Sequence, residues 1–240
     1  MEITADTTIG NIVRYNYKTS QLFEKWRIDY CCGGEKTLVQ ACDETHLDFE
    51  RFKGEIEEIL LMEDWDSQYL EELSPGALCD YIVKRHHQYI QVNAPLILQR
   101  LQKLIDVHSS QHSQLYEIKR LFEDATDKLI IHMKKEELLF FPFIKTLYGD
   151  LKKRIKTRVN VPELKDLLQQ LTTDHEAEGK RFKTLALLTN QYQIPPDGCH
   201  TFEVTYRSLE DFEKDLHRHI HLENNILFPK IDKLIGSIDS

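Results

Sequence analysis

One pattern occurs twice in the chain, as His132-Met-Lys-Lys-Glu136-Glu-Leu-Leu-Phe-Phe-Pro142 and as His219-Ile-His-Leu-Glu223-Asn-Asn-Ile-Leu-Phe-Pro229. Residues four apart in a helix lie on one face, with β-carbons about 5–6 Å from each other, so each His-x3-Glu pair has chelating geometry. Proline lacks the N–H and clashes with the preceding turn, so each Phe-Pro is predicted to limit how its helix continues. The repeat therefore predicts two helices that carry the same pair of metal ligands.

Length and composition favour a soluble, helix-rich protein. The chain has 240 residues, of which 30% are charged and 41% hydrophobic, with 9 Gly and 7 Pro. The net charge of -9 argues against nucleic acid or an anionic membrane as the partner, because both are bound by fields of lysine and arginine. The basic run 152–158 is short and is expected to be a solvated loop.

The cysteines and the N-terminus indicate a cytoplasmic protein. Residues 1–6 show neither the basic nor the apolar region of a signal peptide, and no apolar stretch approaches the roughly 20 residues of a membrane helix. The five cysteines are odd in number and two are adjacent, which does not resemble the disulfide framework of a secreted domain. We expect them to be reduced.

Apolar periodicity predicts four long amphipathic helices, near residues 76–106, 113–147, 162–190 and 200–235. Long helices joined by short polar loops favour an up-down-up-down four-helix bundle. We therefore expect an all-α fold with a bundle domain at residues 76–236.

A separate small helical domain is predicted at residues 1–62. Its shorter pieces are Ile9–Tyr17, Ser20–Arg27, a Cys31-Cys-Gly-Gly34 turn, Thr37–Cys42 and Asp48–Leu61. The stretch Glu63–Gln68 is charged and has no apolar stripe, so we expect it to be the linker between the domains.

A dinuclear site at one level of a four-helix bundle needs a ligand from each helix, and each predicted helix offers one. The candidates are His86, His132, Glu136, His175, His219 and Glu223. A single i,i+4 His/Glu pair is commonly a hydrogen-bonded surface pair. Two pairs in matching contexts, with a histidine on each remaining helix, favour the metal site instead.

Spacing separates these candidates from the other histidines. His108 lies 22 residues beyond His86, about 33 Å along a helix, so the two cannot share one centre, and His112 is excluded likewise. His217 and His221 form another i,i+4 pair, but they face roughly 200° away from the repeated pair.

His86 and His87 compete for the ligand position on the first bundle helix. The spacing of His86 to Ile82, Val83 and Ile90 favours His86, and His87 stays the alternative.

The ligand types favour iron, with manganese as the next choice. Six histidine and carboxylate ligands exceed what a tetrahedral structural zinc site takes and suit two irons bridged by carboxylates. The Glu-x-x-His motif of ferritin-type sites does not occur in the chain. A nitrogen-rich set is expected to favour small-ligand binding and redox change over iron storage.

The sequence resembles the hemerythrin-like di-iron proteins, and among them the iron–sulfur cluster repair family known as RIC, YtfE or ScdA. The match rests on the order of the six candidates, on the fourth-helix segment 219–229 and on Asp29-Tyr-Cys-Cys-Gly-Gly34. It covers nearly the whole chain. It implies that Glu136 and Glu223 bridge two irons and that the four histidines are terminal ligands. Oxygen-carrying hemerythrins have a histidine where Glu223 stands, so the resemblance does not imply simple oxygen carriage.

The resemblance also implies a function, which is the repair of iron–sulfur clusters damaged by nitric oxide or oxidative stress, through the supply of iron. Damaged iron–sulfur proteins would be the partners and nitric oxide or oxygen the small ligands, and a homodimer is left open. Two alternatives remain: a sensor or binding protein for nitric oxide or oxygen, and a di-iron nitric oxide reductase. Cys31 and Cys32 are expected to hold iron or undergo redox chemistry if their thiolates are exposed. The alternative is that they only shape their turn.

Overall fold

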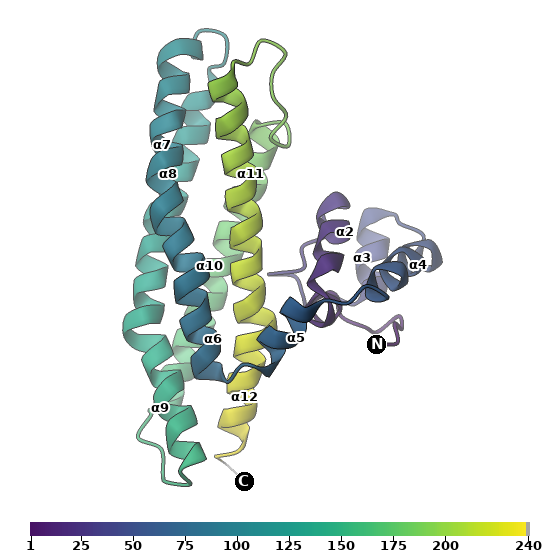
Figure 1. Ribbon diagram of the computed structural model, residues 1–240, viewed down its shortest axis with the longest axis vertical. Coiled ribbons are helices and arrows are strands. Elements are labelled where there is room, and N and C mark those ends of the chain that lie inside the picture. Colours follow the sequence, from purple (N-terminus) through teal and green to yellow (C-terminus); the bar gives the residue numbers. More distant parts are fainter. Residues whose placement is uncertain (239–240) are drawn as a thin grey trace.

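The computed structural model describes residues 1–238 as helices, turns and loops, with no β-strand in that range. Figure 1 shows four long helical rods standing side by side and a small helical domain against one side of them. The predicted all-α bundle with a small helical N-terminal domain is confirmed. Within this range no helix has both the length and the apolar character of a membrane span.

The four rods of the bundle follow the predicted periodicity. They are α6 (Pro75–Ile82) with α7 (Gln88–His108), α8 (Gln114–Lys135) with α9 (Phe141–Lys152), α10 (Val161–Leu188), and α11 (His200–His221) with α12 (Phe228–Gly236). Two of the starts are capped, because Ser74 accepts a hydrogen bond from the Ala77 N–H and Asn160 accepts one from the Glu163 N–H. A proline follows each of these caps within the first turn, where its missing N–H has no helical partner to lose.

Three of the rods contain a π-turn, at Val83–His87, Glu136–Phe140 and Leu222–Leu227. The N–H of Phe141 donates to the Glu136 carbonyl, and the N–H of Phe228 donates to the Glu223 carbonyl, five residues back in both cases. Each widened turn ends two residues before the proline of its repeat and lets the helix continue past that proline. Each Phe-Pro is therefore accommodated by a local π-turn, and the helix does not end there.

The N-terminal domain consists of α1 (Ile9–Tyr15), a short 3₁₀ turn (Tyr17–Thr19), α2 (Ser20–Lys25), α3 (Leu38–Thr45) and α4 (Phe49–Leu60). The Cys-Cys-Gly-Gly turn lies between α2 and α3, as predicted. Thr37 and Gln40 form a reciprocal capping box that starts α3.

The expected linker is a helix. Residues Trp65–Glu72 form α5, whose start is capped by Asp64 through the Ser67 N–H. Glu71 accepts a hydrogen bond of 2.8 Å from Nε of Arg14, which ties α5 to α1. The segment still connects α4 to α6, and capping and contacts with another element, rather than an apolar stripe along the segment, hold this short helix in place.

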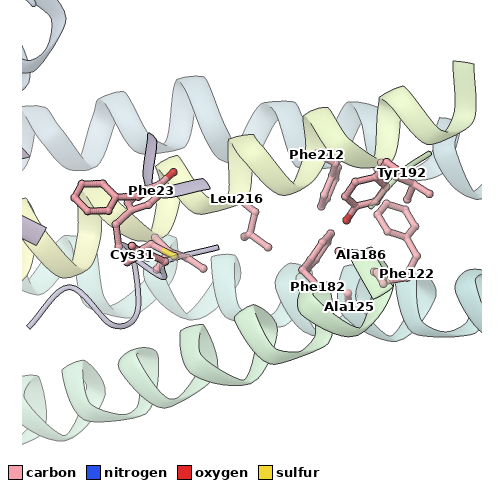
Figure 2. Close-up of a cluster of buried hydrophobic side chains, with 14 of the residues drawn as sticks. Phe23, Cys31, Phe122, Ala125, Phe182, Ala186, Tyr192, Phe212 and Leu216 are labelled. Atoms are coloured by element: carbon pink, nitrogen blue, oxygen red, sulfur yellow. The ribbon is translucent and has the colours of Figure 1, made fainter. Parts of the chain in front are cut away.

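One hydrophobic core runs from the bundle into the N-terminal domain. In Figure 2, Phe122, Phe182 and Phe212 meet between the bundle helices, while Cys31 and Phe23 approach from the small domain. The Phe212 ring centroid lies 5.0 Å from that of Phe122 and 5.8 Å from that of Phe182. The small domain is thus packed against the bundle through buried side chains.

Candidate metal centre

Two groups of buried histidines and glutamates meet at the level of the π-turns. The first group is His132, Glu136, His175 and Glu223, and the second is His87, Glu136, His219 and Glu223. Within each group, the atoms able to bind a metal lie within 4.8 Å of one another. Both groups contain the same two glutamates, so the glutamates stand between two adjacent sites.

Glu136 presents one carboxylate oxygen to each group. Its Oε1 lies 3.4 Å from Nε2 of His132, and its Oε2 lies 3.3 Å from Nε2 of His87. His132 is one helical turn before Glu136 on α8, as the repeat predicts, whereas His87 comes from the first rod. The carboxylate is completely buried.

Glu223 has the same relationship to the other two histidines. Its Oε1 lies 3.2 Å from Nε2 of His219, and its Oε2 lies 3.0 Å from Nε2 of His175. Nε2 of His175 is also 3.1 Å from Nε2 of His132. Each pair of histidines therefore faces one oxygen of each glutamate.

The buried polar atoms at this point fit a bound cation. Both carboxylate oxygens of Glu136 and of Glu223, together with Nε2 of His87 and of His219, are buried without a hydrogen-bond partner. A buried polar group that is left unsatisfied costs about 1–3 kcal/mol, and more if it is charged. Six such atoms converging on two points are explained by positive charge at those points.

His87, and not His86, belongs to the second group. Nδ1 of His86 lies 3.1 Å from Oδ1 of Asp215, and its ring stacks on that of His219 with centroids 5.7 Å apart. Spacing along an ordinary α-helix favours His86, but the π-turn at Val83–His87 adds a residue to the turn and changes which side chain faces inward. No Phe-Pro follows this π-turn, so the sequence carried no signal for it.

Three of the four histidines are oriented through their second ring nitrogen. Nδ1 of His87 lies 2.7 Å from Oε1 of Glu137. Nδ1 of His132 lies 3.4 Å from Oδ2 of Asp174, and Nδ1 of His175 lies 2.8 Å from Oδ1 of Asn224. An acceptor at Nδ1 keeps the proton there and leaves the Nε2 lone pair for a metal. None of these three acceptors is predicted from the sequence, although each stands directly beside a candidate ligand, and this adjacency is a usable signal.

Charge within the centre shifts the protonation of its groups. Burial by itself would lower the pKa of His132, but Glu136 and Asp174 raise this pKa to about 10. Burial would raise the pKa of Glu223, but His219 and His175 hold it well below its usual value. Without a cation, His132 thus carries a proton that compensates the carboxylates, so metal binding must displace protons.

The cysteine turn lies directly behind one of these histidines. Sγ of Cys32 lies 3.4 Å from the backbone carbonyl of His175, and Sγ of Cys31 lies 3.9 Å from Sγ of Cys32. Oδ1 of Asp29 accepts the N–H groups of Cys32 and Gly33, which fixes the turn. Asp29, Cys31 and Cys32 form a third group whose possible metal-binding atoms lie within 4.8 Å of one another.

The two thiols differ in exposure. Cys32 is half-buried, but Cys31 is buried, contrary to the exposed thiolate pair that a Gly-Gly turn suggested. The hydrogen bond with Cys32 and burial raise the pKa of Cys31 well above its usual value. Cys31 is therefore a thiol in this conformation, at the wall of a cavity of about 520 Å³ that Asp29, Tyr30 and His217 also line.

The histidines that spacing excluded lie elsewhere. His108 has Nε2 3.3 Å from Sγ of Cys199, and His112 pairs with Asp197. The rings of His217 and His221 contact Tyr30 of the N-terminal domain, with centroid distances of 6.2 and 5.9 Å. None of the four belongs to either His/Glu group.

Comparison with known proteins identifies the class. Residues 80–231, more than half of the chain, match the hemerythrin HHE cation-binding domain, and the chain belongs to that family. Residues 5–60 match the ScdA_N domain, which is described as a domain of unknown function.

Two relatives match along nearly their whole length. The chain is 30% identical over 229 residues to the iron–sulfur cluster repair protein ScdA of Staphylococcus haemolyticus, covering 95% of this chain and 99% of the relative. It is 28% identical over 228 residues to the iron–sulfur cluster repair protein YtfE of Escherichia coli, covering 94% and 96%. The resemblance inferred from the sequence motifs is confirmed.

Proposed function

We propose that this chain repairs iron–sulfur clusters damaged by nitric oxide or oxidative stress, and that it does so as a di-iron protein that supplies iron. The observation that carries the proposal is the pair of buried His/Glu groups that share Glu136 and Glu223. The names of the two relatives agree with it.

In this proposal His132 and His175 would hold one iron, and His87 and His219 would hold the other. Glu136 and Glu223 would contribute to both sites, because each has one oxygen beside each pair of histidines. The six side chains supply more donors than tetrahedral zinc takes, and their nitrogen and oxygen atoms suit iron, with manganese next.

The residues around the centre orient its ligands and exclude water. Glu137, Asp174 and Asn224 fix three imidazoles through Nδ1, so that Nε2 of each of these histidines would be left for the cation. Phe141 and Phe228 stack on His87 and His175 and cover the centre with apolar rings. Two irons held there would supply redox change and bind nitric oxide or oxygen.

We also propose that Cys31 and Cys32 take part in iron transfer or in its redox chemistry. Their position supports this role, because the Cys32 thiol touches the backbone of His175 and both thiols lie near the carboxylate of Asp29. Since Cys31 is buried, its use requires the turn to move away from the bundle.

The decisive experiment is the metal content of the purified chain, measured by elemental analysis beside a Glu136→Ala/Glu223→Ala variant. About two irons per chain, lost in the variant, are expected from a dinuclear bundle site. The iron-loaded chain should then restore an iron–sulfur enzyme inactivated by nitric oxide, and the variant should not. One zinc ion, or no metal with the variant unchanged, would overturn the proposal.

A sensor or binding protein is the second candidate, because the complete burial of Glu136 and Glu223 favours retention of the metal. Incubation of the iron-loaded chain with a metal-free cluster protein separates the two functions. A donor transfers its iron without being unfolded, whereas a sensor keeps its iron through cycles of nitric oxide binding.

A further inference from the structure

A single side-chain amide joins the metal centre to the cysteine turn. Oδ1 of Asn224 lies 2.8 Å from Nδ1 of His175, and Nδ2 of Asn224 donates a hydrogen bond of 3.0 Å to the carbonyl oxygen of Cys31. Asn224 follows the bridging candidate Glu223 and lies in the π-turn Leu222–Leu227. One residue therefore touches a candidate ligand with one end of its amide and the N-terminal domain with the other.

The two ends of this amide cannot be set independently. An ion on Nε2 of His175 leaves Nδ1 as the protonated nitrogen, which must donate to Oδ1 of Asn224. With Oδ1 fixed, Nδ2 points at the carbonyl of Cys31. Without an ion, no coordination bond holds the ring of His175 in place, so the ring no longer fixes Oδ1 of Asn224. The hydrogen bond from Nδ2 to the carbonyl of Cys31 is then held less firmly.

We infer that Asn224 couples metal occupancy at His175 to the docking of the Cys31–Cys32 turn. An ion on His175 holds the turn against the bundle, and release of the turn weakens the binding of that ion, because coupling between two sites acts equally in both directions. The inference rests on the proposed metal centre and adds a means of opening it. A client protein that pulls the turn away would lower the affinity of the chain for the iron.

Asn225 provides a neighbouring control. Its Nδ2 donates to the carbonyl of Tyr30 at 3.1 Å and lies 3.0 Å from Nδ1 of His221, so it holds the same turn through contacts that bypass His175. Removal of its amide should loosen the turn equally with and without metal. Removal of the Asn224 amide should abolish the difference that metal makes.

The test is the rate at which N-ethylmaleimide alkylates Cys32 in the full chain, followed by peptide mass spectrometry under anaerobic conditions with and without Fe(II). In the wild type, Fe(II) should slow the labelling of Cys32 about fivefold or more, the lower end of typical coupling between sites. Cys199 is exposed and is joined to His108 at another part of the bundle, so its rate should not change with metal.

Asn224→Asp is the most informative variant. Its carboxylate still accepts the proton of His175 Nδ1 but has no N–H to donate to Cys31. At an Fe(II) concentration that loads the variant, the protection of Cys32 by Fe(II) should therefore disappear. Asn225→Ala should raise the rate of Cys32 labelling both with and without Fe(II), and the ratio of these two rates should stay at its wild-type value. Protection that survives in Asn224→Asp and in Asn224→Ala would overturn the coupling while leaving the metal centre intact. Failure of the wild type to bind Fe(II) would overturn the proposed function and the coupling together.

Discussion

Nε2 of His87 lies 3.3 Å from Oε2 of Glu136, and both side chains are completely buried. The contact joins the first rod of the bundle to the repeated pair on the second, and it exists because a π-turn at Val83–His87 turns His87 inward. It makes His87, rather than its neighbour His86, the ligand from this rod in the proposed centre.

Substitution of each of these neighbours tests the assignment. His87→Ala should lower the iron content from about two per chain to about one, because it removes one histidine from one of the two sites. His86→Ala removes the partner of Asp215 and should keep both irons. Elemental analysis measures the content, and thermal unfolding shows whether each variant is folded. Full iron in His87→Ala with loss in His86→Ala would restore the assignment from sequence spacing.

Removal of metal should destabilise the folded chain, since it would leave six buried polar atoms that have no hydrogen-bond partner without the cation that compensates them. An ion present at a thousand times its dissociation constant stabilises the fold by about 4 kcal/mol. For a chain of this size, that corresponds to a loss of roughly 10 °C in melting temperature when a chelator removes one such ion.

Calorimetry with and without chelator measures this shift. The Glu136→Ala/Glu223→Ala variant serves as its control, because its melting temperature should not respond to chelator. Equal melting temperatures of the wild type in both conditions would contradict the presence of a stabilising ion.

The cysteine turn should be separable from the metal centre. Cys31→Ala/Cys32→Ala removes two thiols that belong to neither His/Glu group, so the iron content should stay at the wild-type level. Repair of an iron–sulfur enzyme damaged by nitric oxide should fall if the thiols take part in transfer. Cys42→Ala, at a buried cysteine of α3, is the matched control for the loss of a thiol in the same domain. Wild-type repair by the double variant would exclude a role for Cys31 and Cys32.

A fall in pH should destabilise the folded chain through His221, whose ring contacts Tyr30 of the N-terminal domain. Burial, with further lowering by Arg218 and Arg14, brings the pKa of His221 to about 3, whereas an unfolded histidine has a pKa of about 6.5. Between these pH values the unfolded chain binds the extra proton, so the stability contributed by His221 is present above pH 6.5 and is lost as the pH falls toward 3.

Urea unfolding of the metal-free wild type and His221→Gln isolates this effect. The free energy of unfolding of the wild type should fall relative to the variant by about 1.4 kcal/mol per pH unit in this range. A constant difference between the two proteins from pH 6.5 to pH 4 would show that His221 is not buried in its neutral form.

Cys199 should be the most reactive thiol at neutral pH. Backbone N–H groups at the start of α11 and the contact with His108 lower its pKa to about 7, and the side chain is exposed. Its rate of reaction with iodoacetamide should reach half of its maximum near pH 7. His108→Gln should move this midpoint to higher pH, because the imidazole no longer stabilises the thiolate. An unchanged midpoint would assign the shift to the helix start alone.

The sequence by itself determined the bundle, the repeated pairs and five of the six residues that form the two buried His/Glu groups. Helical periodicity and an i,i+4 spacing depend only on neighbours along the chain, so His132 with Glu136 and His219 with Glu223 were recognisable from one helix at a time. His175 followed from the need for a ligand on every rod. The family motifs then indicated iron and cluster repair, and full-length relatives bear those names.

Only the tertiary structure decided which residues from other parts of the chain lie beside the two His-x3-Glu pairs. A π-turn without a Phe-Pro selected His87 over His86, and a cap with contacts to α1 made a helix of the expected linker. The contact of Asn224 with both His175 and Cys31 joins residues 193 positions apart. The physical reason is that periodicity records which face of a helix is buried, whereas turn geometry and contacts between distant segments are fixed when the helices pack together.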